Sequence, residues 1–273
     1  MRVSIVTISF NQGAFLERTI LSVLNQDYPS VEYILIDAGS TDQTRTIIEK
    51  YRRSFSVVVI ERDQGPADGL NKGFSLATGE IFGFLNADDV LYEGTLSRVG
   101  QFFRDHPLVD VVSGHCAVIG EDDKLKRFSY SDRFSLLLHA YGASNLMQPS
   151  TFFRAEAYRE AGGFNVGNRS NWDAELFVDM ALHGARFGRL KAVLSGYRLH
   201  SASITQSRRL HDLIRQYNDS AFLRIIGRKR RPFDRFLGNG FLIVKYMLEP
   251  RSLYERLMKG KIYGRANTKG SEL

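Results

Sequence analysis

The chain has 273 residues, and 43% of them are apolar, which is ample for one large domain or two small ones. Its net charge of +7 comes from the carboxyl-terminal tail, because residues 207–273 carry 16 Lys and Arg against 6 Asp and Glu (+10). Residues 1–206 carry 21 Lys and Arg against 24 Asp and Glu (−3). The single cysteine, Cys116, excludes an intramolecular disulfide and a cysteine-based zinc cluster. No apolar run approaches the roughly 18 residues that cross a bilayer, and the chain starts with a predicted strand rather than a signal-peptide pattern, so we expect a cytoplasmic protein.

The first 92 residues alternate between predicted strands and predicted helices. Runs of β-forming or apolar residues that end at turn residues predict strands at 3–10, 31–36, 57–60 and 81–85. Helices are predicted from Leu16 to the break at Tyr28-Pro29, from a cap at Ser40 or Thr41 to Tyr51, and from Pro66 to Gly79. This alternation predicts an α/β fold with a mainly parallel sheet flanked by helices, in which ligands bind at the carboxyl ends of the strands.

Polar side chains follow all four predicted strands. They are Asn11 after the first strand, Asp37 after the second, Asp63 after the third, and Asn86, Asp88 and Asp89 after the fourth. Adjacent carboxylates beside an apolar core repel one another, and a divalent cation that carries phosphate oxygens would compensate them. The alternative for Asn86 and Asp88 is a turn that caps a helix starting near Glu93.

Asp37 and Lys72 have side chains that suit a nucleotide. A carboxylate such as Asp37 can accept the N–H of a base imide, which favours uracil or thymine over adenine and leaves guanine open, because guanine also has a ring N–H; Lys72 can neutralise phosphate. Each residue alone could be a turn former or a solvated charge. The four polar strand ends together favour a nucleotide site.

Residues 3–42 and the segment Glu-Arg-Asp-Gln-Gly-Pro-Ala-Asp-Gly-Leu-Asn-Lys-Gly at 61–73 closely resemble the family 2 glycosyltransferases. The resemblance covers residues 3 to about 205 and implies a GT-A (Rossmann-like) fold, a nucleotide-sugar donor, Mn²⁺ or Mg²⁺, and inversion at the anomeric carbon. In this family the residue that matches Asp37 contacts the base. The residues expected to bind the nucleotide-sugar are Thr7, Ser9, Asn11, Asp37, Ser40, Asp63, Asp68, Asn71, Lys72, Asn86 and Asp88.

The metal ligands are expected near the fourth strand end. The family's short acidic motif contacts ribose and metal, and it usually opens with Asp where this chain has Asn86, so both Asp88 and Asp89 stay candidates for the main ligand. Residues 197–203 are similar to the end of the family's catalytic domain, where a histidine can contact the metal or the diphosphate. The third candidate ligand is therefore His200, with a purely structural histidine as the alternative.

Residues 93–205 form the predicted acceptor half. We expect a β-hairpin over 109–128, a strand over 148–154, a short helix that Gly162-Gly163-Phe164 closes, and a helix that begins near Asn171. The segment Asn-Trp-Asp-Ala-Glu-Leu at 171–176 resembles the family's acidic segment whose first aspartate is the general base, which makes Asp173 the candidate. One displacement at the anomeric carbon needs one carboxylate to take the acceptor's proton.

The acceptor half has alternatives of its own. An acidic first turn favoured by the helix dipole would also place Asp173 and Glu175 there. The residues expected to contact the acceptor are Gln148, Trp172 and Glu175, and the alternative for Trp172 is a place in the core.

The resemblance fades from residue 206. We expect a catalytic domain at 1–205, divided into a nucleotide-binding half (1–92) and an acceptor half (93–205), and a basic, amphipathic helical extension at 206–273. A basic cluster at 228–231 precedes an apolar helix face at 233–248. Such a pair can lie on an anionic membrane at its inner face, or the helix can pack on the catalytic domain or on a second subunit in a homodimer.

These features predict an inverting, metal-dependent glycosyltransferase of hexosyltransferase type. It would move a sugar from a UDP- or dTDP-sugar to a sugar or lipid-linked acceptor, in surface polysaccharide or lipopolysaccharide biosynthesis. A sugar-1-phosphate nucleotidylyltransferase would need a basic, glycine-rich loop after the first strand, whereas residues 10–15 are neutral. A non-enzymatic membrane or nucleic-acid binder would leave the acidic strand ends unexplained, so we expect no nucleic-acid partner.

Overall fold

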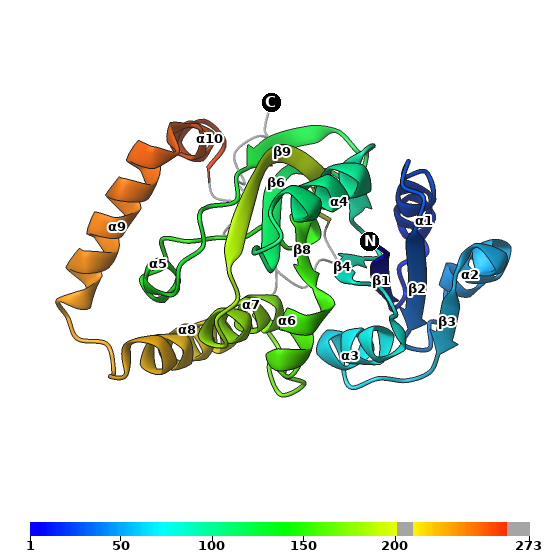
Figure 1. Cartoon of the computed structure of the whole chain (residues 1–273), viewed down its shortest axis with the longest axis horizontal. Coiled ribbons are helices and arrows are strands. Elements are labelled where there is room, and N and C mark those ends of the chain that lie inside the picture. The colour runs from blue at the N-terminus through cyan, green and yellow to red at the C-terminus, as the bar shows by residue number, and fades with distance from the viewer. Residues whose placement is uncertain (201–209, 261–273) are drawn as a thin grey trace, which may run out of the picture.

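The computed structural model describes residues 1–200 and 210–260. Within these ranges one nine-stranded sheet runs through the molecule, and helices cover both of its faces (Figure 1). Neighbouring strands follow the order β3-β2-β1-β4-β8-β6-β9-β5, and β7 pairs with β6 outside this path. The expected α/β sheet flanked by helices is confirmed.

The first half of the sheet is parallel, as predicted. It consists of the strands β1 (Val3–Ser9), β2 (Val31–Asp37), β3 (Val57–Ile60) and β4 (Ile81–Asn86), which alternate with α1 (Leu16–Leu24), α2 (Thr44–Tyr51), η1 (Arg52–Ser54) and α3 (Pro66–Leu76). The register pairs Ser9 with Asp37 across β1 and β2, and Ile8 with Asn86 across β1 and β4. The polar strand ends therefore meet at one edge of the sheet.

The second half mixes directions, which the strand and helix alternation did not reveal. It contains β5 (Val90–Leu91), α4 (Thr95–Asp105), β6 (Val111–Ile119), β7 (Leu125–Ser129), α5 (Leu136–Ala140), η2 (Gln148–Ser150), β8 (Thr151–Arg154), α6 (Ala155–Glu160), α7 (Trp172–Leu182) and β9 (Phe187–Arg198). Strand β8 runs antiparallel to both β4 and β6, and β6 runs parallel to β9. The expected hairpin is confirmed as β6 and β7. The expected strand at 148–154 starts only at Thr151, because the short helix η2 precedes it.

Alternating side chains of the sheet fill two cores. Ile5 of β1 packs in one core with Leu16 and Ile20 of α1 and with Val99 of α4. Its neighbour Val6 packs in the other, where the members contributed by helices include Leu70 and Phe74 of α3, Tyr158 of α6 and Phe177 of α7. Successive side chains of a strand point to opposite faces, and each fully buried large apolar side chain contributes about 1.5–3 kcal/mol. Two cores thus hold the strand ends at a fixed edge.

One expected helix cap is wrong, and so is the cap considered as the alternative for the fourth strand end. Helix α2 begins at Thr44 rather than beside Ser40, because the Ser40 hydroxyl donates instead to Asp37 (2.6 Å). Asn86 and Asp88 cap no helix, since strand β5 follows them and α4 begins at Thr95 after Gly94. Gly94 has φ 71°, a left-handed conformation that suits glycine.

The carboxyl-terminal part is helical, as expected. It consists of α8 (Leu210–Ile226), α9 (Asp234–Leu248) and α10 (Pro250–Lys259). Helix α8 packs beside α5 and α7, α9 runs along the edge of the molecule, and α10 returns to β7 (Figure 1). The predicted boundary at 205–206 lies outside the described residues. In the described parts of the chain, no helix is long and apolar enough to span a bilayer.

Candidate functional site

A cleft of about 1310 Å³ opens where the strand ends meet. Its first end is formed by loops that follow β1 to β4, including Ser9, Gln12, Gly39, Thr41, Arg62, Asp63, Asn86 and Asp88. Its second end is formed by later segments, including Phe134, His139, Asn145, Gln148, Trp172, Asp173, Tyr197 and Ile214. The predicted nucleotide and acceptor halves thus face each other across one cavity.

The loop after β2 is organised by Asp37. This carboxylate is fully buried and accepts four hydrogen bonds, from the hydroxyls of Ser9 (2.7 Å) and Ser40 (2.6 Å) and from the backbone N–H groups of Gly39 (3.1 Å) and Ser40 (2.8 Å). Asn11 supports the same loop, since its side-chain oxygen accepts from the Thr41 N–H (2.9 Å). Asp37, Asn11 and Ser40 do not line the cleft themselves. They fix the backbone of residues 38–41, three of which do line it.

Asp88 faces the cleft beside His200. The Nε2 atom of His200 lies 2.9 Å from Oδ2 of Asp88, and the ring is buried against Phe15, with 4.6 Å between centroids. Gln148 closes the floor nearby: its Nε2 donates to the Phe84 carbonyl (2.9 Å), and its Oε1 accepts from Asn86 (3.3 Å). A carboxylate and an imidazole therefore converge at the end of β4.

Asp89 points the other way, into the protein. Its side chain is fully buried, Oδ1 accepts from the Arg198 backbone N–H (2.9 Å), and Oδ2 has no hydrogen-bond partner among the described residues. Burial, followed by the charge of Asp88, raises the pKa of Asp89 well above its usual value. Arg198 also donates to the Asp88 carbonyl (2.7 Å) and the Gly120 carbonyl (2.9 Å). Of the two adjacent aspartates, Asp88 is the one that lines the cleft.

The donor set at Asp88 fits a divalent ion that is bound together with a phosphate ligand. The described residues contain no group of three or more His, Cys, Asp or Glu side chains that could hold a metal alone. One carboxylate and one imidazole would leave the remaining positions to phosphate oxygens, as Mg²⁺ sites commonly do. Carboxylate oxygen also suits Mn²⁺.

Asp173 lies at the second end of the cleft, in the first turn of α7. Burial raises its pKa above the usual 3.8, and backbone N–H groups of residues 173 and 174 offset part of that rise. Among the cleft-lining residues of the second end, Asp173 is the carboxylate. The arrangement can therefore take a proton from a hydroxyl group that enters this end.

The three predicted acceptor contacts have different surroundings. Gln148 and Trp172 line the cleft, and Trp172 also packs on Phe84 and Phe164 with 5.5 Å between ring centroids, so it belongs to the cleft wall and to the core. Glu175 does not line the cleft. Its carboxylate accepts from Asn165 (3.1 Å) and Asn168 (2.6 Å) and thereby holds the loop before α7.

Besides Asn11, Asp37 and Ser40, four further predicted nucleotide contacts do not line the cleft: Thr7, Asp68, Asn71 and Lys72. The Thr7 hydroxyl is buried 3.1 Å from the Tyr33 hydroxyl. Lys72 pairs with Glu61 (3.0 Å) and with Asp68 (3.4 Å). The side-chain amide of Asn71 donates to the Phe164 carbonyl (2.8 Å) and accepts from the Phe164 backbone N–H (2.9 Å), which ties α3 to the segment after α6. The structure gives these residues supporting positions, and their contact with a ligand stays a prediction.

Several cleft residues were not singled out from the sequence. Arg62 directly precedes Asp63 after the third predicted strand, so its place in the cleft could have been predicted from the sequence. Phe134 and Asn145 come from a segment without periodicity, which a hydrogen bond between the Asn145 N–H and Asp132 (2.9 Å) folds back toward the cleft. Only the tertiary structure identifies those two.

Known proteins resemble this chain in sequence. The sequence profile described as "Glycosyl transferase family 2" matches residues 4–161. An uncharacterized glycosyltransferase of Nostoc is 33% identical over 45% of this chain and 39% of its own, and a PGL/p-HBAD biosynthesis glycosyltransferase of Mycobacterium bovis is 31% identical over 63% and 68%. A GalNAc(5)-diNAcBac-PP-undecaprenol beta-1,3-glucosyltransferase of Campylobacter jejuni is 30% identical over 47% and 42%. The chain thus spans about two fifths to two thirds of these relatives.

Solved structures share the fold at lower identity. Staphylococcus aureus TarS 1-349 in complex with UDP has a TM-score of 0.64 at 19% identity and covers 94% of this chain and 75% of its own. The mannosyltransferase PcManGT of Pyrobaculum calidifontis, in complex with GDP-Man and Mn²⁺, has a TM-score of 0.63 at 20% identity and covers 96% and 76%.

Proposed function

Because this chain belongs to glycosyl transferase family 2 and is a glycosyltransferase, we propose that it is an inverting, metal-dependent enzyme that moves a sugar from a UDP- or dTDP-sugar to a sugar or lipid-linked acceptor. The proposed setting is surface polysaccharide assembly in the cytoplasm, at the inner face of the membrane. The observation that carries the proposal is one cleft that is lined by Asp88, which His200 contacts, at the end of β4 and by Asp173 at the other end.

Asp173 is the proposed general base. Burial raises its pKa, so the carboxylate takes a proton more readily than an exposed aspartate does. A single carboxylate at this end suits a direct displacement by the acceptor hydroxyl, which inverts the anomeric carbon. Trp172 and Gln148, which line the same wall, would orient the acceptor.

Asp88 and His200 are the proposed metal ligands, with Asp88 favoured over Asp89 because it faces the cleft. A bound Mn²⁺ or Mg²⁺ would neutralise the diphosphate that leaves with the nucleotide. The complex of PcManGT with GDP-Man and Mn²⁺ supports the assignment at the level of the fold.

The loop that Asp37 organises is the proposed nucleotide platform. The TarS complex with UDP supports a uridine donor, and the neutral loop after β1 disfavours the nucleotidylyltransferase alternative. Thermal melts with a panel of nucleotide-sugars, with and without manganese, test this, because a ligand that binds the native state raises its melting temperature. We expect the largest shift from a UDP- or dTDP-sugar with manganese. A larger shift from an ADP-sugar would overturn the base assignment, and equal shifts with chelator would overturn the metal.

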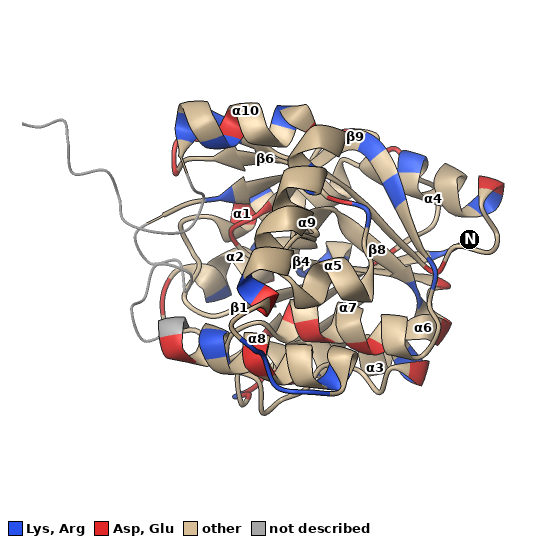
Figure 2. Cartoon of the chain, turned by 90° about the vertical axis from the view of Figure 1, so that its left-hand side faces the viewer, with Lys and Arg blue, Asp and Glu red and all other residues tan. Residues whose placement is uncertain are grey.

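Helix α9 is the proposed membrane contact. Its outward face carries the exposed apolar side chains Phe233, Phe236, Leu237, Ile243, Val244, Met247 and Leu248. Every exposed charge of residues 229–259 is basic, whereas Asp234 and Glu255 are buried and Glu249 pairs with Arg189 (Figure 2). An apolar helix face bordered only by cations matches an anionic bilayer surface.

Sedimentation with anionic vesicles at low salt tests the membrane contact. Reversing Lys229, Arg231 and Arg235 to Glu should abolish binding, because each basic residue near the surface contributes roughly 1 kcal/mol. The matched control reverses Arg45, Arg53 and Arg104, which are exposed residues of α2, of the η1 segment that follows it and of α4; helices α2 and α4 lie on the other side of the sheet strands from α9 in Figure 1. A wild-type protein that stays in the supernatant and elutes as a dimer would assign the face to a second subunit instead.

A further inference from the structure

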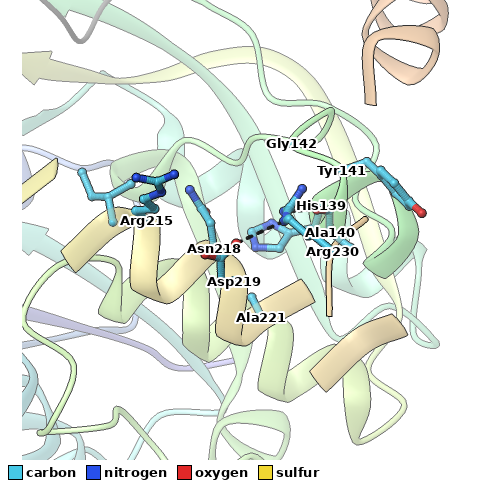
Figure 3. A pocket seen from close by; sticks show the side chains of 10 residues that line it. His139, Ala140, Tyr141, Gly142, Arg215, Asn218, Asp219, Ala221 and Arg230 are labelled. Atoms are coloured by element: carbon cyan, nitrogen blue, oxygen red, sulfur yellow. Dashed lines mark hydrogen bonds and ion pairs between the residues drawn. The ribbon is translucent and has the colours of Figure 1, made fainter. Parts of the chain in front are cut away.

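A second cavity, of about 380 Å³, lies beside the cleft (Figure 3). It is formed by the end of α5, one face of α8 and a residue of the segment before α9; the lining residues are His139, Ala140, Tyr141, Gly142, Ile214, Arg215, Asn218, Asp219, Ala221 and Arg230. His139 and Ile214 line both cavities. The second cavity therefore adjoins the acceptor end of the cleft, away from Asp88.

The polar groups of this cavity are mostly hydrogen-bond donors. Arg215 and Asn218 are three residues apart on α8 and project from the same face of the helix (Figure 3). Arg215 is exposed and forms no ion pair with any described residue. Two arginines against the single carboxylate of Asp219 give the lining a charge of +1. Such a lining suits an anion.

Arg230 is held in place before any ligand binds. Its Nη2 donates to the Ala140 carbonyl (2.7 Å), its Nε lies 3.4 Å from Oδ1 of Asp219, and the guanidinium stacks 4.4 Å from the Phe222 ring centroid. These contacts use only some of its five N–H donors. A fixed guanidinium with unused donors loses little entropy on binding a phosphate, which it can contact with two parallel hydrogen bonds.

The position of the cavity restricts the class of ligand that it can bind. On one side lies the cleft in which the acceptor hydroxyl would meet Asp173. On the other side the chain runs from Arg230 into α9, whose outward face is apolar. A ligand that spans both sides carries a saccharide, then an anionic group, then a lipid.

We propose that this cavity binds the phosphate or diphosphate group of a lipid-linked acceptor. The inference rests on the proposed function, because it assumes that the adjoining cleft holds the acceptor saccharide. Arg215, Asn218 and Arg230 bind the phosphate oxygens, and Asp219 keeps Arg230 oriented. The site fixes the position of the acceptor, so that the sugar next to the phosphate group lies at a fixed distance from Asp173.

Calorimetry with the full chain tests the site. UDP and manganese are added first at saturating concentration to occupy the donor end, and farnesyl diphosphate is then titrated, with farnesol as the uncharged control. Arg215→Gln and Arg230→Gln should each weaken farnesyl diphosphate binding by about 10-fold or more, since each removes charge-assisted hydrogen bonds. Asp219→Asn keeps an oxygen for Arg230 and removes a negative charge, so it should tighten binding.

The matched control is Arg45→Gln, an exposed arginine of α2 outside both cavities that should leave the affinity unchanged. Unchanged affinity in both Arg215→Gln and Arg230→Gln, with normal melting temperatures, would overturn the site. Equal binding of farnesol would overturn it as well, because the lipid alone would then carry the affinity.

Two further readouts identify what failed. Dihexanoyl phosphatidylglycerol presents a single phosphate diester, and we expect it to bind at least about 10-fold more weakly than farnesyl diphosphate; equal binding would assign the cavity to a bilayer lipid and overturn the acceptor assignment. The initial UDP titration reports the proposed function separately. If UDP binds with manganese and farnesyl diphosphate does not, only this inference fails.

Discussion

The loop after β2 and the second end of the cleft shift the pKa values of their ionisable groups in opposite directions. In the loop after β2, at the proposed nucleotide end, Asp37 accepts four hydrogen bonds, and the pKa of Asp42 is lowered because hydrogen bonds from Thr44 and Gly13 outweigh its partial burial. At the second end, which is the proposed acceptor end, burial raises the pKa of Asp173 and lowers the pKa of His139 to about 4. The loop therefore favours the charged form of Asp42, and the second end favours the neutral forms of Asp173 and His139.

This difference distinguishes a residue that fixes the structure of a loop from a residue that can exchange a proton. A carboxylate that accepts several hydrogen bonds, as Asp37 does, fixes the loop that donates them. A carboxylate with little besides burial to perturb it can gain and lose a proton during turnover. The contrast predicts stability effects at the first end and rate effects at the second.

The largest expected effect is on Asp173. Asp173→Asn keeps the shape and removes the proton acceptor, so turnover should fall by about 100-fold or more while UDP affinity changes little. The matched control is Glu175→Gln, which retains an oxygen for Asn165 and Asn168 and should keep most of the turnover. Steady-state kinetics measure both variants, and the reverse order of effects would move the base to Glu175.

The pH profile sharpens the same prediction. A raised pKa means that Asp173 is protonated, and inactive as a base, at pH values where an ordinary aspartate of pKa 3.8 is still ionised. The kcat/KM value should therefore rise with pH on an acid limb that lies above pH 3.8. An acid limb at or below that value would contradict the desolvated environment.

The second effect concerns the nucleotide end. Asp37→Ala leaves buried hydroxyl and backbone donors without their acceptor and should lower the free energy of unfolding by about 2 kcal/mol. The exposed Asp27 provides the control, since Asp27→Ala should stay within about 0.5 kcal/mol of the wild type. Urea unfolding measures both. Equal stabilities would show that Asp37 is not the organiser of its loop.

The third effect separates the adjacent aspartates. Asp88→Asn should reduce the manganese-dependent gain in UDP affinity by about 10-fold, because a neutral amide is a weaker ligand for a hard cation. Asp89→Asn keeps an oxygen for the Arg198 N–H and should retain that gain. Calorimetry with manganese and with chelator compares them. If only Asp89→Asn lost the manganese-dependent gain in UDP affinity, the metal ligand would be the inward-facing Asp89.

The sequence predicted the parallel half of the fold well because its signals are local. Strands β1 to β4 are apolar runs that end at polar turns, and parallel pairing then brings Ser9, Asp37 and Asn86 to one edge. The antiparallel entry of β8 between β4 and β6 depends on contacts between residues 38 to 73 positions apart in the chain, which no local pattern encodes.

In the candidate site, too, the sequence predicted the local features and missed those that depend on tertiary contacts. The identity of the acidic residues could be read from the strand ends, but the direction of each side chain could not. Asp88 and Asp89 are chemically identical, and only the pairing of β5 with β9 and the bond from the Arg198 backbone turn Asp89 inward. Likewise, nothing in the sequence of Thr7 or Asn71 indicates that their polar atoms bond to Tyr33 and Phe164.

The smallest expected effect tests the acceptor end through His139, which lies between the two cavities with Nε2 3.1 Å from the Tyr217 hydroxyl. The pKa of this histidine is 6.5 when unperturbed and about 4 in the fold, so between these values the unfolded chain binds more protons than the folded one. Stability contributed by the neutral ring is therefore complete above pH 6.5 and is lost as the pH falls toward 4.

His139→Gln removes this titration and keeps a polar atom for Tyr217. Between pH 7 and pH 5.5 the wild type should lose about 1 kcal/mol more free energy of unfolding than the variant, as measured by urea unfolding at each pH. His106→Gln, at an exposed histidine after α4, is the matched control and should follow the wild type. Parallel curves for wild type and His139→Gln would mean that the acceptor end does not disfavour charge. The contrast between the two ends would then rest on Asp173 alone.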